Sequence, residues 1–113
     1  MQSVIEKMAQ ALSCELTANR GKSLKECAIY DFYTTAWDGV KRTIMLKVSI
    51  FAATMQRSLE LQDELERALV TLGDRPLTET ALSCQQNGGG WLMDGDWNCR
   101  ISYFEVTIKD INT

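Results

Sequence analysis

The chain contains no histidine, and none of its apolar runs approaches the ~20 residues that a membrane-spanning helix needs. Without histidine it lacks the commonest metal ligand and the side chain most often used as a general base. Residues 1–7, MQSVIEK, also lack the basic start and apolar run of a signal peptide. These absences predict synthesis in the cytoplasm, no membrane partner and no histidine-dependent catalysis.

Closely spaced cysteines are absent as well. The four cysteines stand singly along the chain, whereas a zinc site needs paired spacings such as C-x-x-C. Four cysteines allow three disulfide connectivities, but a cytosolic chain normally keeps its thiols reduced. We therefore predict no metal and no cofactor, and we interpret as small buried hydrophobic residues Cys14, Cys27, Cys84 and Cys99.

Positive charge is scarce. The formal net charge is −3, and lysine and arginine form only small clusters at positions 20–25 and 41–42. Proteins that bind nucleic acids usually present a basic face that neutralises several phosphates. We therefore expect no direct binding to nucleic acid.

Motifs that carry chemistry are also missing. The run Gly88-Gly89-Gly90 precedes a predicted strand instead of a helix and lacks a Lys-Ser/Thr pair, which favours a hairpin loop over a phosphate cradle. Asp94 and Asp96 flank Gly95 as in a turn, without the twelve-residue loop of a calcium site. No Gly-x-Ser-x-Gly elbow is present. We predict no catalytic residue, although two acidic residues could still converge in a hydrolase.

Two stretches have the period of an amphipathic helix. In residues 2–17 apolar side chains recur every four positions, with Ser3 as the expected N-cap and an expected stop at 19–21. In Ser58–Leu72 the expected N-cap is Ser58, and Gly73 and Pro76 follow. The predicted inner stripe of this second helix consists of Leu61, Leu65, Ala68, Leu69 and Leu72.

Between the helices the sequence predicts a long hairpin. Strands are expected over Leu24–Thr35 and Val40–Ala52, joined by a turn at Trp37-Asp38-Gly39, since Asp-Gly supplies the positive φ angles of tight turns. In the second strand the core-facing residues are Ile44, Leu46, Val48 and Ile50. The opposite face is predicted to be uncovered, bearing Tyr33, Met45 and Phe51.

The C-terminal third predicts a second hairpin: a short strand Ala81–Gln86, a bend at 87–90, and a β-prone stretch Trp91–Lys109. From Trp97 on, its apolar residues alternate at odd positions up to Tyr103 and at even positions from Phe104. This shift indicates either a β-bulge or a strand buried on both faces. The 113 residues therefore predict one α+β domain of order α-β-β-α-β-β. The expected architecture is an antiparallel four-stranded sheet with two helices packed on one face.

This order of elements resembles that of the tail terminator and tail-completion proteins of long-tailed bacteriophages, also described as minor tail or minor capsid proteins. The resemblance covers nearly the full length. It rests on the first helix, the long hairpin, the helix ending in Leu72-Gly73, the glycine-rich bend and the run WNCRISYFEVTI at 97–108. It implies a non-enzymatic virion protein that assembles as a ring, commonly a hexamer. Such a ring caps the tail tube, stops its polymerisation and contacts the head connector.

The resemblance further implies assembly in the host cytoplasm, a final place at the head–tail junction, and tail tube and head-completion proteins as partners besides the chain itself. A ring needs interfaces in which one patch meets a different patch of the neighbour. Trp97 is expected to cap the core's edge, whereas Trp37 and Trp91, in predicted loops, fit either core or interface. The predicted contact residues are Trp37, Asp38, Gly39, Lys41, Thr43, Lys47, Trp91, Leu92 and Met93.

Two alternatives remain open. One is a small cytosolic α+β adaptor or immunity-type protein that pairs one-to-one with a partner. The other is a small hydrolase or ligand-binding domain that uses buried carboxylates.

Overall fold

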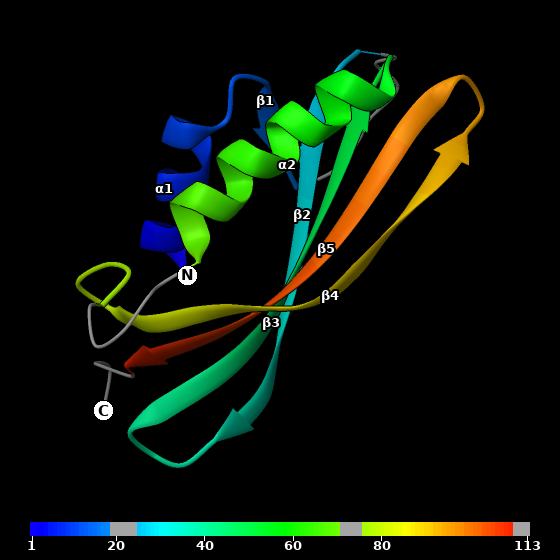
Figure 1. The fold of residues 1–113 in the computed structure, drawn as a ribbon. Coiled ribbons are helices and arrows are strands. Elements are labelled where there is room, and N and C mark those ends of the chain that lie inside the picture. Colours follow the sequence, from blue (N-terminus) through cyan, green and yellow to red (C-terminus); the bar gives the residue numbers. More distant parts are fainter. Residues whose placement is uncertain (19–24, 71–75, 110–113) are drawn as a thin grey trace.

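Two helices lie on one face of a five-stranded sheet (Figure 1). The computed structural model describes residues 1–18, 25–70 and 76–109. Its elements in chain order are α1 (Gln2–Ala11), β1 (Glu15–Thr17), β2 (Cys27–Trp37), β3 (Lys41–Ala52), α2 (Met55–Leu69), β4 (Ala81–Asp94) and β5 (Trp97–Lys109).

The strand order is β1-β2-β3-β5-β4, with β1 parallel to β2 and every other pair antiparallel. The predicted α+β class and the two helices are confirmed. The predicted four-stranded antiparallel sheet is wrong, because β1 adds a fifth, parallel strand at one edge.

The first helix is shorter than its apolar spacing predicts. It ends at Ala11, and residues 15–17 pair instead with the start of β2, which offers backbone hydrogen bonds that a longer helix would forgo. Ser13 fixes the bend between them by donating its N–H to Glu64 Oε1 at 2.9 Å. Ser3 is not the N-cap, since Met1 holds that position and the Ser3 hydroxyl hydrogen-bonds to the hydroxyls of Thr78 and Thr80. The predicted stop at 19–21 lies outside the described residues.

The second helix begins earlier than predicted. Thr54 is its N-cap and accepts a hydrogen bond from Arg57 N at 3.1 Å, so Ser58 is not the cap. The Ser58 side chain is buried one turn inside the helix, where its hydroxyl donates to Met55 O at 2.7 Å. The helix ends at Leu69. The predicted Leu72 and Gly73 end lies outside the described residues.

The first hairpin lies where the sequence predicts it, but Trp37, predicted in the turn, is the last residue of β2, and β3 begins at Lys41. Its turn lies at Asp38-Gly39, and the strands pair from Cys27↔Phe51 to Trp37↔Arg42, with a register shift between Thr34 and Ala36. Strand β2 thus continues past the predicted end at Thr35, while its predicted start at Leu24 lies outside the described residues.

The second hairpin differs from its prediction. Residues 87–90 are not a bend between strands but part of one continuous strand, β4, which shifts register between Gln86 and Gly89. Gly88 takes φ +108°, and a Cβ on Gly89 would lie 2.6 Å from the carbonyl oxygen of Ile101. The glycines therefore let β4 bulge and pass close to β5. The hairpin turn follows Asp94, with Gly95 at φ +62°.

The apolar residues of β5 lie on one face of the sheet in its first part and on the other face in its second part. Strand β5 pairs with β3 in one unbroken register from Asn98 to Lys109, so this strand contains no bulge against β3. Phe104 and Val106 point into the core beneath the helices, whereas Cys99 and Ile101 lie on the opposite face. The strand is therefore apolar on both faces, at different points along its length.

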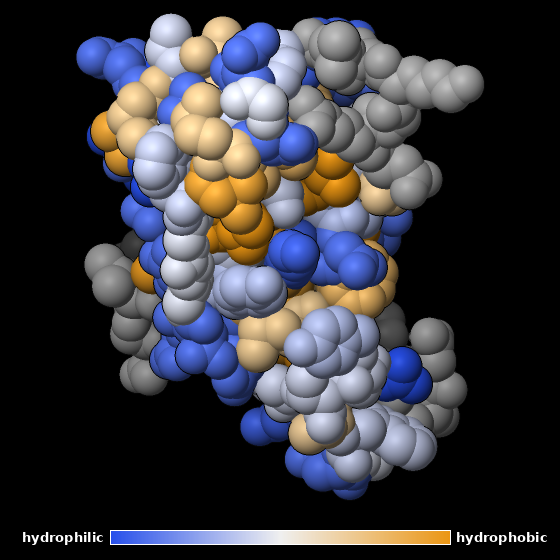
Figure 2. All heavy atoms as spheres, turned by 90° about the vertical axis from the view of Figure 1, so that its right-hand side faces the viewer, coloured by the Kyte–Doolittle hydropathy of each residue, from blue (hydrophilic) through white to orange (hydrophobic). Residues whose placement is uncertain are grey.

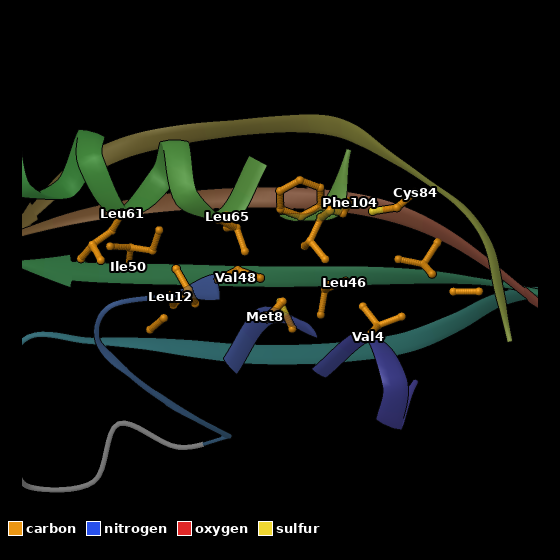
Figure 3. Packing of buried hydrophobic residues seen from close by; sticks show 14 of the residues in the cluster. Val4, Met8, Leu12, Leu46, Val48, Ile50, Leu61, Leu65, Cys84 and Phe104 are labelled. Atoms are coloured by element: carbon orange, nitrogen blue, oxygen red, sulfur yellow. The ribbon is translucent and has the colours of Figure 1, made fainter. Parts of the chain in front are cut away.

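The main core lies between the helices and the sheet. Figure 3 shows side chains of both helices and of β3, β4 and β5 pointing toward one another there. Its fully buried members include Val4, Met8, Leu46, Val48, Ile50, Leu61, Leu65, Cys84 and Phe104.

A smaller cluster lies on the other face of the sheet. It contains Cys27, Phe51 and Cys99, with Trp97 packed against it as predicted. Phe51 was expected on an uncovered face but is only 8% exposed, because side chains of neighbouring strands surround it. All four cysteines lie within the described residues, and none of them forms a disulfide. Cys27, Cys84 and Cys99 are buried, as the sequence predicts, whereas Cys14 is half-buried.

Candidate protein interface

The ends of the two hairpins extend beyond the helices (Figure 1). Every residue of β2 from Asp31 to Trp37 and of β4 from Gln85 to Asp94 is exposed. The molecule is elongated, with a longest extent of 45 Å, and the two hairpin turns lie at opposite ends of it. Two separate surfaces are thus available for contact.

The first surface is the hairpin tip, residues Trp37–Arg42. Trp37 and Val40 are 58% and 59% exposed, which is unusual for apolar side chains of this size in a strand and turn. Asp38 Oδ1 accepts hydrogen bonds from the N–H groups of Val40 (2.9 Å) and Lys41 (2.6 Å). These bonds, that of Lys41 foremost, lower the pKa of Asp38 below its usual value, so its carboxylate is ionised at neutral pH.

Trp37 is held in place at this tip. The Arg42 guanidinium lies 5.6 Å from the centre of the indole ring, within the range of a cation–π interaction. The register pairs the two residues directly across the hairpin. The ring is therefore stabilised by its own hairpin without being buried, which suits a side chain that inserts into a partner.

The second surface is the triplet Trp91, Leu92 and Met93, which are 46%, 45% and 51% exposed. The prediction placed them in a loop, but they lie within β4, so alternate side chains point to opposite faces. Trp91 Nε1 donates to Asn98 Oδ1 at 3.2 Å, and Asn98 Nδ2 donates to Ala53 O at 3.3 Å. These bonds link the Trp91 ring, through Asn98, to Ala53 in the β3–α2 connection.

The remaining predicted contact residues lie on β3. Lys41, Thr43 and Lys47 share the face opposite the helices, with Lys47 level with Asp31 of β2. The structure therefore brings Trp37, Asp38, Gly39, Lys41 and Thr43 to one end of the molecule. It does not bring Trp91, Leu92 or Met93 to them. That any of these residues contacts a partner remains a prediction.

Both edges of the sheet offer backbone hydrogen-bonding groups. β4 is the outermost strand on one side, and on the other β1 pairs only with Cys27–Ile29 of β2. Within the described chain, no strand pairs with the outer edge of β2 from Tyr30 to Trp37. Such open edges are templates for pairing with another chain.

A groove of about 350 Å³ lies between α2 and the β4–β5 hairpin. Figure 2, which views the molecule from the right-hand side of Figure 1, shows hydrophobic residues gathered in the upper half of this face beside hydrophilic ones. The groove is lined by Gln62 and Glu66 of α2, by Gln86 and Gly89–Trp91 of β4, and by Arg100, Ile101 and Ser102 of β5.

Sequence reasoning missed this groove. The signal for it is the run of polar side chains Asn98, Arg100 and Ser102 on the same face of β5 as the buried Phe104. Polar residues at core-facing positions of a strand need hydrogen-bond partners, so they indicate where the apolar packing beneath the helices ends.

The described residues hold few groups suited to catalysis. Within residues 1–18, 25–70 and 76–109, no acidic side chain is fully buried, and no three His, Cys, Asp or Glu residues are grouped as for a metal ion. Across the same three ranges, neither helix combines the length and the apolar character required to cross a bilayer.

No protein-family model and no curated protein sequence matches this chain. A chain in the solved virion of a native gene transfer agent (GTA) particle is similar in structure, with a TM-score of 0.66. The alignment covers 95% of this chain and 92% of that chain at 11% sequence identity. The likeness shows that the two chains share a fold over nearly their whole length.

Proposed function

We propose that this chain is a non-enzymatic structural protein of a phage or phage-like virion, of the tail terminator or tail-completion type. In this role it assembles as a ring that caps the tail tube and joins it to the head connector. The observation that carries the proposal is the shared fold with a chain of the gene transfer agent virion, over almost the full length of both. The phage-type resemblance of the element order supports the same conclusion.

The two exposed hairpin ends support assembly into a ring. Head-to-tail contact in a ring needs two different patches on each subunit. The hairpin tip and the Trp91–Met93 triplet are such patches, and they lie on different hairpins. The open edges of β2 and β4 add backbone groups that can pair between neighbours. The expected partners are further copies of the chain, then tail tube and head-completion proteins, with assembly in the host cytoplasm.

The test is the oligomeric state of the purified chain, measured by sedimentation velocity and native mass spectrometry, alone and with isolated phage tail tubes. A ring-sized species in either condition is expected. Trp37→Ala and Trp91→Ala should each shift the chain toward monomer, because each removes one half of the same contact. Leu59→Ala is the matched control, since Leu59 is a 50% exposed apolar residue on α2, away from both hairpins.

Mixing the two variants sharpens the test. The Trp37→Ala subunit keeps an intact triplet, and the Trp91→Ala subunit keeps an intact tip. The mixture should therefore form one-to-one pairs that cannot close into a ring. A chain that stays monomeric with and without tail tubes, or a strict one-to-one complex with an unrelated protein, would contradict the ring and favour the adaptor alternative.

A further inference from the structure

Two buried polar atoms that line the groove between α2 and the β4–β5 hairpin have no hydrogen-bond partner among the described residues. They are Gln62 Oε1, an acceptor, and Arg100 Nε, a donor. The Gln62 side chain is only 8% exposed, and its amide nitrogen is already used, donating to Glu66 Oε1 at 3.1 Å. Arg100 Nη2 donates to Met55 Sδ, which is a weak acceptor.

These unused groups define what the groove would bind. A guanidinium without a carboxylate partner is complemented best by an acidic side chain, which accepts charge-assisted hydrogen bonds. An unused amide oxygen is complemented by an N–H donor. Glu66 also lines the groove, and its carboxylate is complemented by a positively charged side chain. The complementary ligand is therefore a short turn that carries an acid, a free N–H and a base.

The hairpin tip of this same chain supplies the acid and the base of that set. Asp38 presents an exposed, ionised carboxylate whose Oδ1 closes the turn, and Lys41 is exposed three residues later. Trp37 and Val40 add exposed apolar surface beside these charges. Because the tip and the β4–β5 hairpin lie at opposite ends of the molecule, one subunit can offer its tip to the groove of the next.

We propose that the groove between α2 and β4–β5 receives the hairpin tip of a second copy, with Asp38 facing Arg100 and Lys41 facing Glu66. This inference rests on the proposed ring and specifies its subunit contact. In this contact Trp91, which lines the groove, packs against Trp37 or Val40 of the neighbouring copy. It also gives a carboxylate partner to Arg100 Nε, which has no hydrogen-bond partner among the described residues.

The experiment is a set of charge substitutions in the full chain, with the dissociation constant between subunits measured by sedimentation equilibrium. Asp38→Asn keeps the side-chain oxygen that closes the turn but removes the charge, and Arg100→Met removes the guanidinium. Each should weaken association by about tenfold or more. Lys25→Met is the matched control, because Lys25 is an exposed base just before β2 begins at Cys27, at the end of that strand away from the tip.

A charge exchange tests the pairing directly. Lys41→Glu and Glu66→Lys should each weaken association, and the double variant should return to within about threefold of the parent, as expected for partners in contact. Thermal unfolding of each variant as monomer checks that folding is unchanged. The groove contact would be overturned if the double variant bound as weakly as the single variants. It would also be overturned if Arg100→Met and Lys25→Met had the same dissociation constant between subunits.

The outcomes also separate this inference from the proposed function. A ring that Trp37→Ala disrupts but Arg100→Met leaves intact keeps the virion role and rejects the groove. A chain that binds tail tubes but never self-associates rejects the groove as well, while retaining a role at the tail.

Discussion

Gly89 lies where β4 passes closest to β5, and a side chain there would meet backbone. A Cβ would lie 2.6 Å from the carbonyl oxygen of Ile101, whereas a Cβ on Gly90 would meet nothing within 4 Å. We expect Gly89→Ala to lower the free energy of unfolding by about 1–3 kcal/mol. Gly90→Ala should change it by less than about 0.5 kcal/mol. Chemical denaturation of both variants measures the difference, and equal midpoints would contradict the close approach.

The buried thiols predict a dependence of stability on pH. Burial raises the pKa of Cys84 to about 12 and, with the charge of Glu26, that of Cys14 to about 11, against an ordinary value of 9.0. In the unfolded chain these thiols ionise near pH 9, so above that pH the folded state binds more protons than the unfolded state. Their contribution to stability is complete below pH 9 and is lost as the pH rises toward 11 to 12.

This prediction is checked by the free energy of unfolding between pH 8 and 10.5. The decline should be shallower in Cys84→Ala than in the parent, even if the variant is less stable throughout. A thiol-reactive dye at pH 7.5 should label Cys84 only as fast as the protein unfolds, because the protonated, buried thiol is unreactive. Rapid labelling of the folded chain would contradict the burial.

At the scale of elements, the start of α2 depends on one hydroxyl. Thr54 Oγ1 accepts the N–H of Arg57, and helix N-caps of this kind contribute about 1 kcal/mol. Thr54→Ala should lower the free energy of unfolding by that amount, whereas Thr54→Asp, which keeps an acceptor, should not. Urea denaturation measures both variants. A loss as large in Thr54→Asp would show that the cap is not the cause.

The elements that the sequence predicted well are those whose pattern is complete within the segment. The alternation of Ile44 and its neighbours defined β3, and Asp38-Gly39 defined the first turn, because local φ angles and one buried face decide both. The second helix was found from its apolar stripe but misplaced at its start. Thr54 and Ser58 both suit a cap, and tertiary burial of Ser58 chose between them.

The elements that were missed depend on a partner distant in the sequence. Leu16 continues the apolar spacing of the first helix, yet it lies in β1, because this segment pairs with the edge of β2. The glycines at 88–90 have the composition of a loop, but β5 supplies the partner that keeps them in a strand. The groove residues Gln62 and Arg100 could not be identified, because their burial depends on how α2 lies over a hairpin.

At the scale of the whole molecule, burial is concentrated in the middle of the sheet and decreases toward the hairpin ends. The middles of β3 and β5 lie beneath the helices, whereas Asp31–Trp37 of β2 and Gln85–Asp94 of β4 are exposed along their whole length. Amide hydrogen exchange should therefore be slowest around Leu46 and Phe104 and fastest toward Asp38 and Gly95, since few buried contacts protect those ends.

The same measurement distinguishes the isolated chain from the assembly. In a ring, amides near Asp38 and along Gly89–Met93 should exchange more slowly than in the monomer, while those of α1 should not change. Exchange measured by mass spectrometry on dilute and concentrated samples makes the comparison. Equal exchange at both hairpin ends in monomer and oligomer would place the subunit contact elsewhere.

The change of face along β5 has a consequence for how the chain finds its fold. If β5 slid by one residue against β3, Phe104 and Val106 would turn toward water and Glu105 would enter the core. If it slid by two, Ser102 or Val106 would occupy the place of Phe104, and the small cluster around Cys99 would lose its match with Phe51. Because β5 has apolar residues on one face near Cys99 and on the other face near Phe104, a shift in either direction exposes one of the two groups. The two hairpins can therefore pair in a single register.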